Sequence, residues 1–184
     1  MKKTGILIVA VTVVLSSLCG GQTFTVSLGA GIQSPADSGY RDIYGRSVFL
    51  PEIKGGISLS PSLYVWTGYG LVTAKGETPE LKSAAESSQN FLSLGGGYQG
   101  ALSDSLGFKA ELGLADVFYK EEALGETVSG SALGFTAGAG LTYALGKMFF
   151  LQAEAGYLLA QKTINDVKVK MGGLKAGLGA GIRF

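Results

Sequence analysis

Apolar and polar residues alternate along most of this chain in runs of about ten residues. In the last run, apolar residues occupy every second position from Leu174 to Phe184, and glycines with two cations fill the positions between them. The same alternation begins at Phe24, Leu106 and Phe149. Because successive side chains of a strand point to opposite faces, this pattern predicts β-strands with one apolar face.

Two kinds of polar segment separate these runs. Three short turns centre on Pro61, Asp104 and Lys147, which follow one another at intervals of 43 residues. Longer polar stretches alternate with the turns, at residues 34–47, 75–89, 120–131 and 161–166. Short turns at one end and long loops at the other are typical of an antiparallel up-and-down meander. The spacing predicts eight strands.

The glycines indicate which face of the strands lies inside. The chain has 30 glycines, and many of them share the polar face of the predicted strands. A solvent-exposed face favours Thr, Lys and Glu, whereas glycine suits a narrow interior in which strands crowd together. The strand around Trp66 fits either orientation by its own pattern, but the 43-residue period aligns Trp66 with Lys109 and predicts that it faces inward.

Aromatic residues on the apolar face gather toward the two ends of the strands. Phe24, Tyr98, Phe108, Tyr143, Phe149 and Phe184 fall near the short turns, and Phe49, Phe118, Phe135 and Tyr157 fall toward the long loops. Bilayer interfaces select such belts, and about ten tilted residues cross the hydrocarbon. We therefore expect an all-β fold, an eight-stranded antiparallel up-and-down transmembrane β-barrel. A soluble lipocalin-like barrel is the alternative, because it too has one apolar face.

Residues 1–21 have the pattern of a secretory signal peptide. Lys2 and Lys3 precede a short apolar run, and small residues follow through Gly21. The sequence predicts cleavage near Gly21 and a barrel domain over residues 22–184. Cys19 raises the alternative of an acylated lipoprotein start, but Leu18 occupies a position that a lipobox requires to be small. The apolar run is too short for a good membrane-spanning helix.

With these features, the sequence resembles the small eight-stranded outer-membrane barrels, such as the opacity proteins and the transmembrane part of outer membrane protein A. The resemblance covers Thr23 to Phe184 and rests on the signal peptide, the meander and the closing strand LKAGLGAGIRF. It implies a bacterial outer-membrane location, contact with lipid and lipopolysaccharide, and recognition of Phe184 by the outer-membrane assembly machinery. Some relatives carry a periplasmic peptidoglycan-binding domain after the barrel, and we expect this protein to lack a cell-wall anchor of that kind.

The composition argues against several classes of function. The chain has no histidine and a single cysteine, so the side chains that most often activate serine or water, or bind zinc, are scarce. We expect no enzymatic activity, no metal and no cofactor. Without Lys2 and Lys3 the 15 basic residues become 13, against 14 acidic ones, and no basic stripe indicates nucleic acid.

A candidate site emerges from the 43-residue period. Continuing the period places a fourth turn centre just beyond the chain end. Four charged residues of inward parity then each lie seven positions from a turn centre. The predicted lumen layer consists of Lys54, Glu111, Glu154 and Arg183, with Glu52, Lys109 and Lys175 nearby. An eight-stranded interior is only wide enough for side chains, so paired charges predict a closed lumen. A gated ion path is the alternative.

Two further groups of residues are candidates for contacts outside the barrel. Lys168 and Lys170 share the lipid-facing parity of Leu174 but lie above the apolar band, where lipopolysaccharide phosphates are expected. The stretch PADSGYRDIYGRS offers residue types that are enriched at interfaces, for loop recognition of a surface partner: Tyr40, Arg41, Tyr44 and Arg46.

Together these features predict a monomeric, non-enzymatic barrel with a charge-plugged lumen and a structural or surface-interaction role. A small pore or a barrel that transports hydrophobic ligands or lipids is the alternative function.

Overall fold

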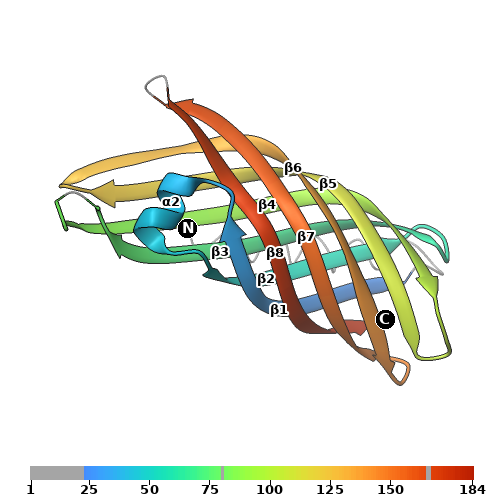
Figure 1. Ribbon diagram of the computed structural model, residues 1–184. Helices are drawn as coiled ribbons and strands as arrows, with labels where there is room; N and C mark the ends of the chain where they lie inside the picture. The colour runs from blue at the N-terminus through green and yellow to red at the C-terminus, as the bar shows by residue number, and fades with distance from the viewer. Residues whose placement is uncertain (1–22, 80, 165–166) are drawn as a thin grey trace.

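A computed structural model describes residues 23–79, 81–164 and 167–184, which form eight strands and one short helix (Figure 1). The predicted signal peptide and Cys19 lie outside the described residues. The elements are β1 (Phe24–Pro35), α2 (Ser38–Tyr44), β2 (Val48–Ser58), β3 (Leu63–Glu77), β4 (Ala84–Ala101), β5 (Leu106–Ala123), β6 (Glu126–Leu145), β7 (Phe149–Ile164) and β8 (Val167–Arg183).

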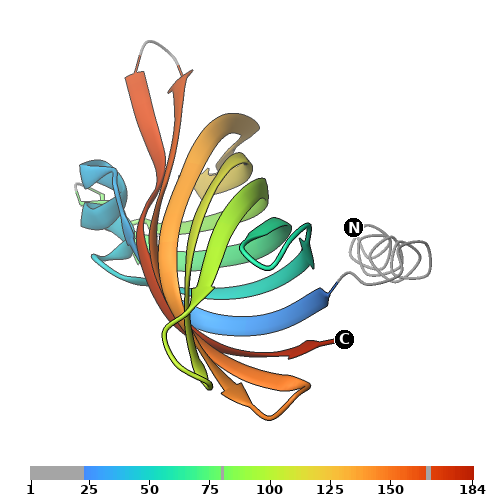
Figure 2. The same ribbon diagram turned by 90° about the vertical axis from the view of Figure 1, so that its right-hand side faces the viewer.

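The strands pair in sequence order, and β1 closes the barrel by pairing with β8 in antiparallel fashion. The up-and-down eight-stranded barrel predicted from the alternation is therefore confirmed. The two ends of the described barrel meet, because the backbones of Phe24 and Phe184 exchange hydrogen bonds of 2.8 and 3.0 Å. We call this end, which also holds the three short turns, the turn end, and the opposite end, where α2 lies, the mouth (Figures 1 and 2).

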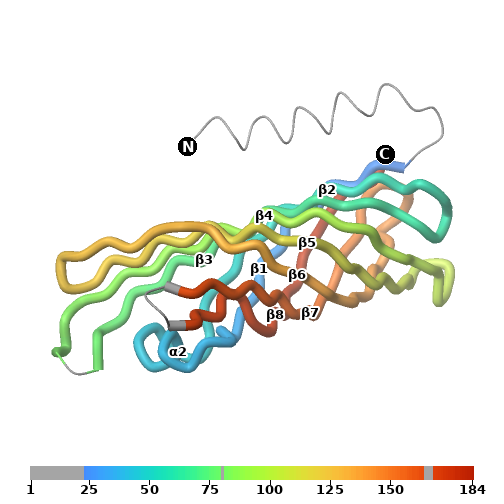
Figure 3. The backbone as a smooth tube through the Cα atoms, turned by 90° about the horizontal axis from the view of Figure 1, so that it is seen from above, coloured from blue at the N-terminus to red at the C-terminus, as the bar shows by residue number. Residues whose placement is uncertain are grey.

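Two of the long polar stretches, 75–89 and 120–131, are mostly strand, whereas 34–47 holds α2 and the segments around it. β3 and β4 stay paired as far as Glu77 and Ala84, and β5 and β6 as far as Ala123 and Glu126. For these two stretches the loop prediction was wrong, because polar side chains on both faces of a strand remove the apolar alternation while the backbone ladder continues. The β3–β4 and β5–β6 hairpins consequently reach far out from the rest of the barrel at the mouth (Figure 3).

The wall divides near the mouth between β6 and β7. Their ladder ends at the pair Gly134 and Ala160, although β6 continues along β5 and β7 continues along β8. Figure 1 shows the β7–β8 hairpin rising away from the β5–β6 hairpin above this point. A side chain bridges the division, since Lys162 Nζ donates to the carbonyl oxygen of Ser131 at 2.8 Å.

The interior has two levels with different chemistry. Toward the mouth it is apolar, which the expectation of a polar interior did not anticipate. Val72 and Val117 are fully buried there, and Tyr40 of α2 packs against the same cluster. We call this cluster the mouth core; it comprises Tyr40, Val48, Leu50, Val72, Ala74, Phe91, Ala115, Val117, Tyr119, Ala132, Leu158, Ala160 and Met171. Toward the turn end, polar and charged side chains fill the lumen.

The outer surface carries the apolar band that a bilayer requires. Six outward side chains from β1, β4, β5, β6 and β8 are 66–71% exposed: Leu28, Leu94, Leu112, Leu133, Phe135 and Leu178. Exposed apolar surface on this scale marks a membrane or protein contact. No helix among the described residues has the length and apolar character needed to cross a membrane.

Close backbone contacts at two places in the fold show why the chain needs so many glycines. Gly95 and Gly113 oppose each other on β4 and β5, and a Cβ on Gly113 would lie 2.6 Å from the carbonyl oxygen of Leu94. At the mouth, a Cβ on Gly76 of β3 would collide with the backbone carbonyl of Ile43 in α2. Glycine thus permits the tight bending of the wall and the close seating of the helix.

Candidate functional site

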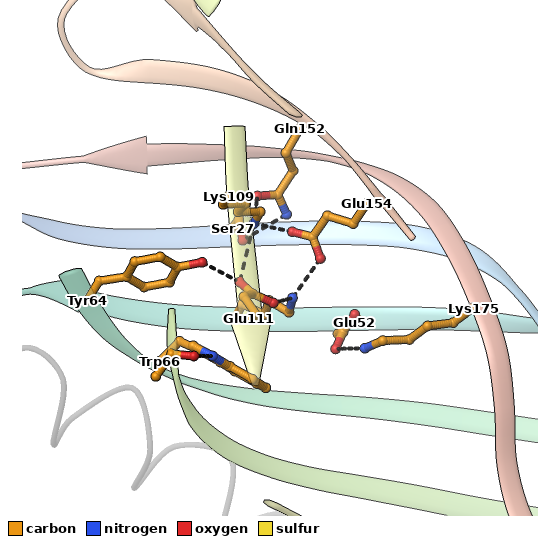
Figure 4. A network of polar contacts seen from close by, with 11 residues as sticks. Ser27, Glu52, Tyr64, Trp66, Lys109, Glu111, Gln152, Glu154 and Lys175 are labelled. Atoms are coloured by element: carbon orange, nitrogen blue, oxygen red, sulfur yellow. Dashed lines mark hydrogen bonds and ion pairs between the residues drawn. The ribbon is translucent and has the colours of Figure 1, made fainter. Parts of the chain in front are cut away.

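Four charged side chains from three strands meet in the lumen and form what we call the charged layer (Figure 4). Lys54 of β2 lies 2.7 Å from Glu111 of β5 and 2.6 Å from Glu154 of β7. Lys109 of β5 pairs with Glu154 and lies 3.6 Å from Glu111. Each ammonium therefore contacts both carboxylates, and the formal charges cancel.

A shell of neutral groups holds the charged layer in place. Tyr64 donates its hydroxyl hydrogen to Glu111 at 2.9 Å, and Lys109 donates to the side-chain oxygen of Gln152 at 3.0 Å. Gln152 in turn donates to Ser27 at 3.2 Å, and the ring of Trp66 lies 5.1 Å from the Lys54 ammonium. The inward orientation predicted for Trp66 is confirmed, with 5% exposure.

The register explains how long charged side chains fit into so narrow a barrel. Glu111 has glycines as its partners on both neighbouring strands, Gly97 on β4 and Gly138 on β6. Glu154 is likewise flanked by Gly140 and Gly177. Because a glycine leaves the volume beside each carboxylate free, the lysines can reach across the lumen to it. The interior glycines and the charged layer are therefore parts of one arrangement.

Burial makes this layer energetically demanding. The four side chains are between 8% and 17% exposed, so water solvates their charges only slightly. Removing a charge from water costs several kcal/mol, and close pairing with extra hydrogen bonds offsets that cost. Each carboxylate here accepts from two or more donors, including Tyr64 and both lysines. The layer therefore depends on all of its members.

Little open space remains around the layer. A cavity of about 40 Å³ is lined by Lys54, Lys109, Glu111 and Glu154 together with Glu52 and neighbouring glycines. A cavity of this size holds a few water molecules. A second ion pair, Lys175 with Glu52 at 2.9 Å, lies beside the layer on the β8–β2 side (Figure 4).

The structure brings together six of the seven charged residues of the predicted layer and its neighbourhood, in two groups, but not Arg183. The expectation that Arg183 completes the layer was wrong. Its guanidinium lies 5.6 Å from the centre of the Phe150 ring, near the turn end, and its Nε has no hydrogen-bond partner within the described part of the chain. Strand shear is the reason, because Glu154 is in register with Gly177 of β8, six residues before Arg183.

The four predicted recognition residues at the mouth do not form one exposed surface. Tyr40 is only 8% exposed and belongs to the mouth core, so its prediction as a contact residue was wrong. Arg41 donates to the backbone oxygen of Pro35 at 2.9 Å, which ties α2 to β1. Tyr44 packs partly against the core, and Arg46 is the exposed member of the set.

The electrostatic surroundings of α2 show how firmly it is seated. Burial raises the pKa of Tyr44 to about 12, and the neighbouring Glu121 carboxylate and Tyr40 add to the shift. Burial also raises the pKa of Tyr40. The helix begins at Asp37, whose side chain accepts from the backbone N–H of Tyr40 at 3.1 Å, and ends at Gly45 with φ of 94°.

The remaining predicted residues lie on the outer surface and at the chain end. Lys168 and Lys170 are exposed, and the backbone N–H of Lys170 donates to Asp37 at 3.2 Å. Phe184 is 52% exposed and its ring stacks at 6.1 Å on that of Phe24.

Sequence reasoning missed the neutral shell around the charges. Tyr64, Gln152 and Ser27 have inward parity, which was visible in the sequence, but only the strand register shows that they reach the charged side chains. The division between β6 and β7 was also missed, because the sequence around Gly134 has no pattern that marks the end of strand pairing.

Comparisons with known proteins agree with this architecture. The family model described as outer membrane protein beta-barrel domain matches residues 6–184. None of the curated proteins has a sequence significantly similar to this one. Among solved structures, OprG from Pseudomonas aeruginosa is 13% identical with a TM-score of 0.69, over 88% of this chain and 95% of that one.

Two other solved structures are similar in fold. The attachment invasion locus protein Ail of Yersinia pestis, solved with the heparin analogue sucrose octasulfate, is 19% identical with a TM-score of 0.60, over 89% of this chain and 99% of that one. A major outer membrane protein from Thermus thermophilus is 17% identical with a TM-score of 0.64, over 89% of this chain and 100% of that one. The chain thus belongs to the outer membrane protein beta-barrel domain family, whose members lie in the bacterial outer membrane.

Proposed function

We propose that this protein is a non-enzymatic, structural or surface-interaction barrel whose lumen is closed by the charged layer. The observation that carries the proposal is the contact of Lys54 with both Glu111 and Glu154, at 2.7 and 2.6 Å, across the full width of the lumen. In this arrangement the lumen stabilises the barrel and the mouth faces the cell exterior.

Two features support closure over conduction. The layer is electrically balanced and its members are largely buried, so an ion passing through would have to displace pairs held in a low-dielectric interior. Above the layer, the mouth core packs apolar side chains across the lumen. Of the two levels, the charged layer is the barrier to ions in this proposal, because the division between β6 and β7 leaves the wall open beside the mouth core.

A surface role is supported by the extension of the strands past the apolar band. The β3–β4 and β5–β6 hairpins carry charged side chains there, including the exposed pair Lys75 and Glu86 at 2.6 Å. Ail, which is similar in fold, is by name an attachment protein. Of the residues predicted for recognition, we retain Arg46 and the exposed part of Tyr44 as contacts of a surface partner.

The proposal includes contacts of the barrel with its membrane and its assembly route. Lys168 and Lys170 bind lipopolysaccharide phosphates, and Phe184 is the signal that the assembly machinery recognises in a monomeric chain after residues 1–21 are removed. A Lys168→Ala, Lys170→Ala variant is expected to co-purify with less lipopolysaccharide than the unmutated protein. Equal amounts would contradict the lysine contact, and normal insertion of a chain lacking Phe184 would contradict the assembly signal.

Transport of hydrophobic ligands is the second candidate function, and the division between β6 and β7 favours it. The division opens the wall beside the mouth core, at the level of the exposed Phe135 and Leu159. Uptake of an apolar fluorescent probe into the barrel interior, lost when a disulfide joins β6 to β7 across the division, would support transport over a purely structural role.

Conductance in planar bilayers tests the charge plug. The unmutated protein is expected to remain electrically silent, and Glu154→Ala is expected to show openings because Lys54 and Lys109 then share a single carboxylate. Glu86→Ala, which removes an exposed pair at the mouth, is the matched control and should stay silent. Steady conductance of the unmutated protein would overturn the plug.

A further inference from the structure

Three buried polar atoms beneath α2 have no hydrogen-bond partner within the described residues. They are the hydroxyl oxygens of Tyr40 and Ser87 and the side-chain oxygen of Gln89, and the three residues are 8%, 4% and 5% exposed. Native proteins satisfy nearly all such groups with protein, ordered water or an ion. The Tyr40 and Ser87 hydroxyls lie close enough to interact with each other, so the Gln89 oxygen is the member of this group that most needs a water or an ion.

The strand register gathers these atoms around one carboxylate. Ser87 and Gln89 face inward from β4, and their direct partners on β5 are Glu121 and Tyr119. Directly opposed residues of an antiparallel pair have Cβ atoms about 4.5–5.5 Å apart. Tyr40 lies close to Ser87 and to Glu121, so oxygen atoms from α2, β4 and β5 come together in the mouth.

The charge at this place is negative and not neutralised by a lysine or arginine. Glu121 forms no ion pair with any described residue, and Asp37 is close enough to repel it. Lys162 reaches the ring of Tyr119 at 6.0 Å, but its ammonium is bonded to the Ser131 carbonyl. Lys120 pairs with the outward-facing Glu122.

We propose that the mouth holds a calcium ion beneath α2, bound by the Glu121 carboxylate and the Gln89 side-chain oxygen. The Ser87 and Tyr40 hydroxyls complete the site, directly or through water on the ion. Hard cations such as calcium take carboxylate, amide and water oxygens in flexible geometry, which matches this set. The site goes beyond the proposed lumen plug, because none of its residues belongs to the charged layer.

The composition of the site sets its strength. The described residues contain no group of three acidic, histidine or cysteine side chains that could hold a metal, so the site relies on neutral oxygens for most of its ligands. Extracellular calcium sites with few charges bind with a Kd of about 10⁻⁴–10⁻³ M. An ion held there joins α2 to β4 and β5, and so fixes the helix over the mouth.

Terbium luminescence tests the site, because bound terbium replaces calcium and neighbouring tyrosines sensitise its emission. The refolded full chain, free of lipopolysaccharide, is titrated with terbium and then with calcium alone. Saturable emission that calcium reverses at about 10⁻⁴–10⁻³ M is expected. Glu121→Gln should weaken binding at least tenfold, whereas Glu122→Gln, the adjacent outward carboxylate, should bind as the unmutated protein does.

A proteolysis readout keeps the test independent of luminescence. Calcium should slow trypsin cleavage after the exposed Arg46 several-fold in the unmutated protein and in Glu122→Gln, but not in Glu121→Gln, with folding of each variant checked by heat-dependent gel mobility. The absence of saturable terbium emission would overturn the proposal. Equal binding by Glu121→Gln, or equal losses in both variants, would overturn it as well, since either result indicates adventitious surface binding or bound water.

Discussion

The two levels of the lumen are filled by opposite means. Near the turn end, four charges and their neutral partners form a network in which every carboxylate is bonded to several donors. Near the mouth, apolar side chains pack together and leave three polar atoms without partners among the described residues. The lower level thus depends on electrostatic balance, and the upper level on packing and on what it binds. Substitutions should separate these two dependences.

The largest effect is expected from unbalancing the charged layer. Glu154→Ala leaves Lys54 and Lys109 to share Glu111, and breaking a buried pair in this way costs about 3–5 kcal/mol. Urea unfolding of the barrel in lipid, followed by tryptophan fluorescence of Trp66, measures the loss. Glu86→Ala at the exposed pair should leave the midpoint unchanged. Equal midpoints for Glu154→Ala and the unmutated protein would contradict the network.

A smaller loss is expected from the mouth core, without any effect on closure. Leu158 is 3% exposed, and Leu158→Ala leaves a cavity that costs about 2–5 kcal/mol. The same unfolding experiment measures this loss, while conductance should remain absent because the charged layer is intact. Conductance in Leu158→Ala would show that packing, and not charge, closes the barrel.

Removing charge in balance should do less harm than removing one charge. Lys54→Met combined with Glu111→Gln leaves Lys109 paired with Glu154, and replacing a buried ion pair by groups of similar volume is often neutral. We expect the double variant to be more stable than Glu154→Ala in the same urea titration. If it is less stable, the individual contacts matter more than the balance of charge.

The packing of α2 against the barrel should weaken as the pH rises in the alkaline range. Burial favours the neutral phenol of Tyr44 and raises its pKa from 10.0 to about 12, so the seated helix is fully stable below pH 10 and loses stability as the pH rises through about 12. Trypsin cleavage after Arg46, sampled between pH 8 and 11 with correction for protease activity, should accelerate at the upper end. Tyr44→Phe should flatten this dependence; an unchanged profile would contradict it.

The smallest effect is expected at Arg183, which lies outside the charged layer. Its guanidinium contacts the Phe150 ring but has no ion pair with any described residue, so Arg183→Ala should cost about 1 kcal/mol or less. A loss as large as that of Glu154→Ala, in the same unfolding experiment, would place Arg183 in the network after all.

Much of the fold and half of the site geometry followed from patterns that depend on local periodicity. Alternation gives the parity of Lys54, Glu111 and Glu154, and the 43-residue period gives their heights on three strands that do not pair with one another. Arg183 failed because shear accumulates around the barrel, so a height carried to β8 across the closing seam is displaced. A sequence read strand by strand contains no measure of this displacement.

The mouth was less predictable because its features arise from tertiary contacts. The residues of α2 have no apolar periodicity, and Tyr40 looks like a loop residue until it inserts among Val72, Val117 and other side chains of the barrel. The long strands β5 and β6 lose their apolar face beyond the membrane and therefore resembled loops. In both cases packing and backbone pairing, which the local pattern does not encode, decided the outcome.

Ion flux through liposomes tests the closure of the lumen by charge most directly. The unmutated protein is compared with a variant truncated at all four members of the layer: Lys54→Ser, Lys109→Ser, Glu111→Ser and Glu154→Ser. Each protein is reconstituted at equal density and its fold is checked by heat-dependent gel mobility. We predict that potassium stays trapped with the unmutated barrel and leaks through the truncated one. Equal leakage from both, or none from either, would contradict the account.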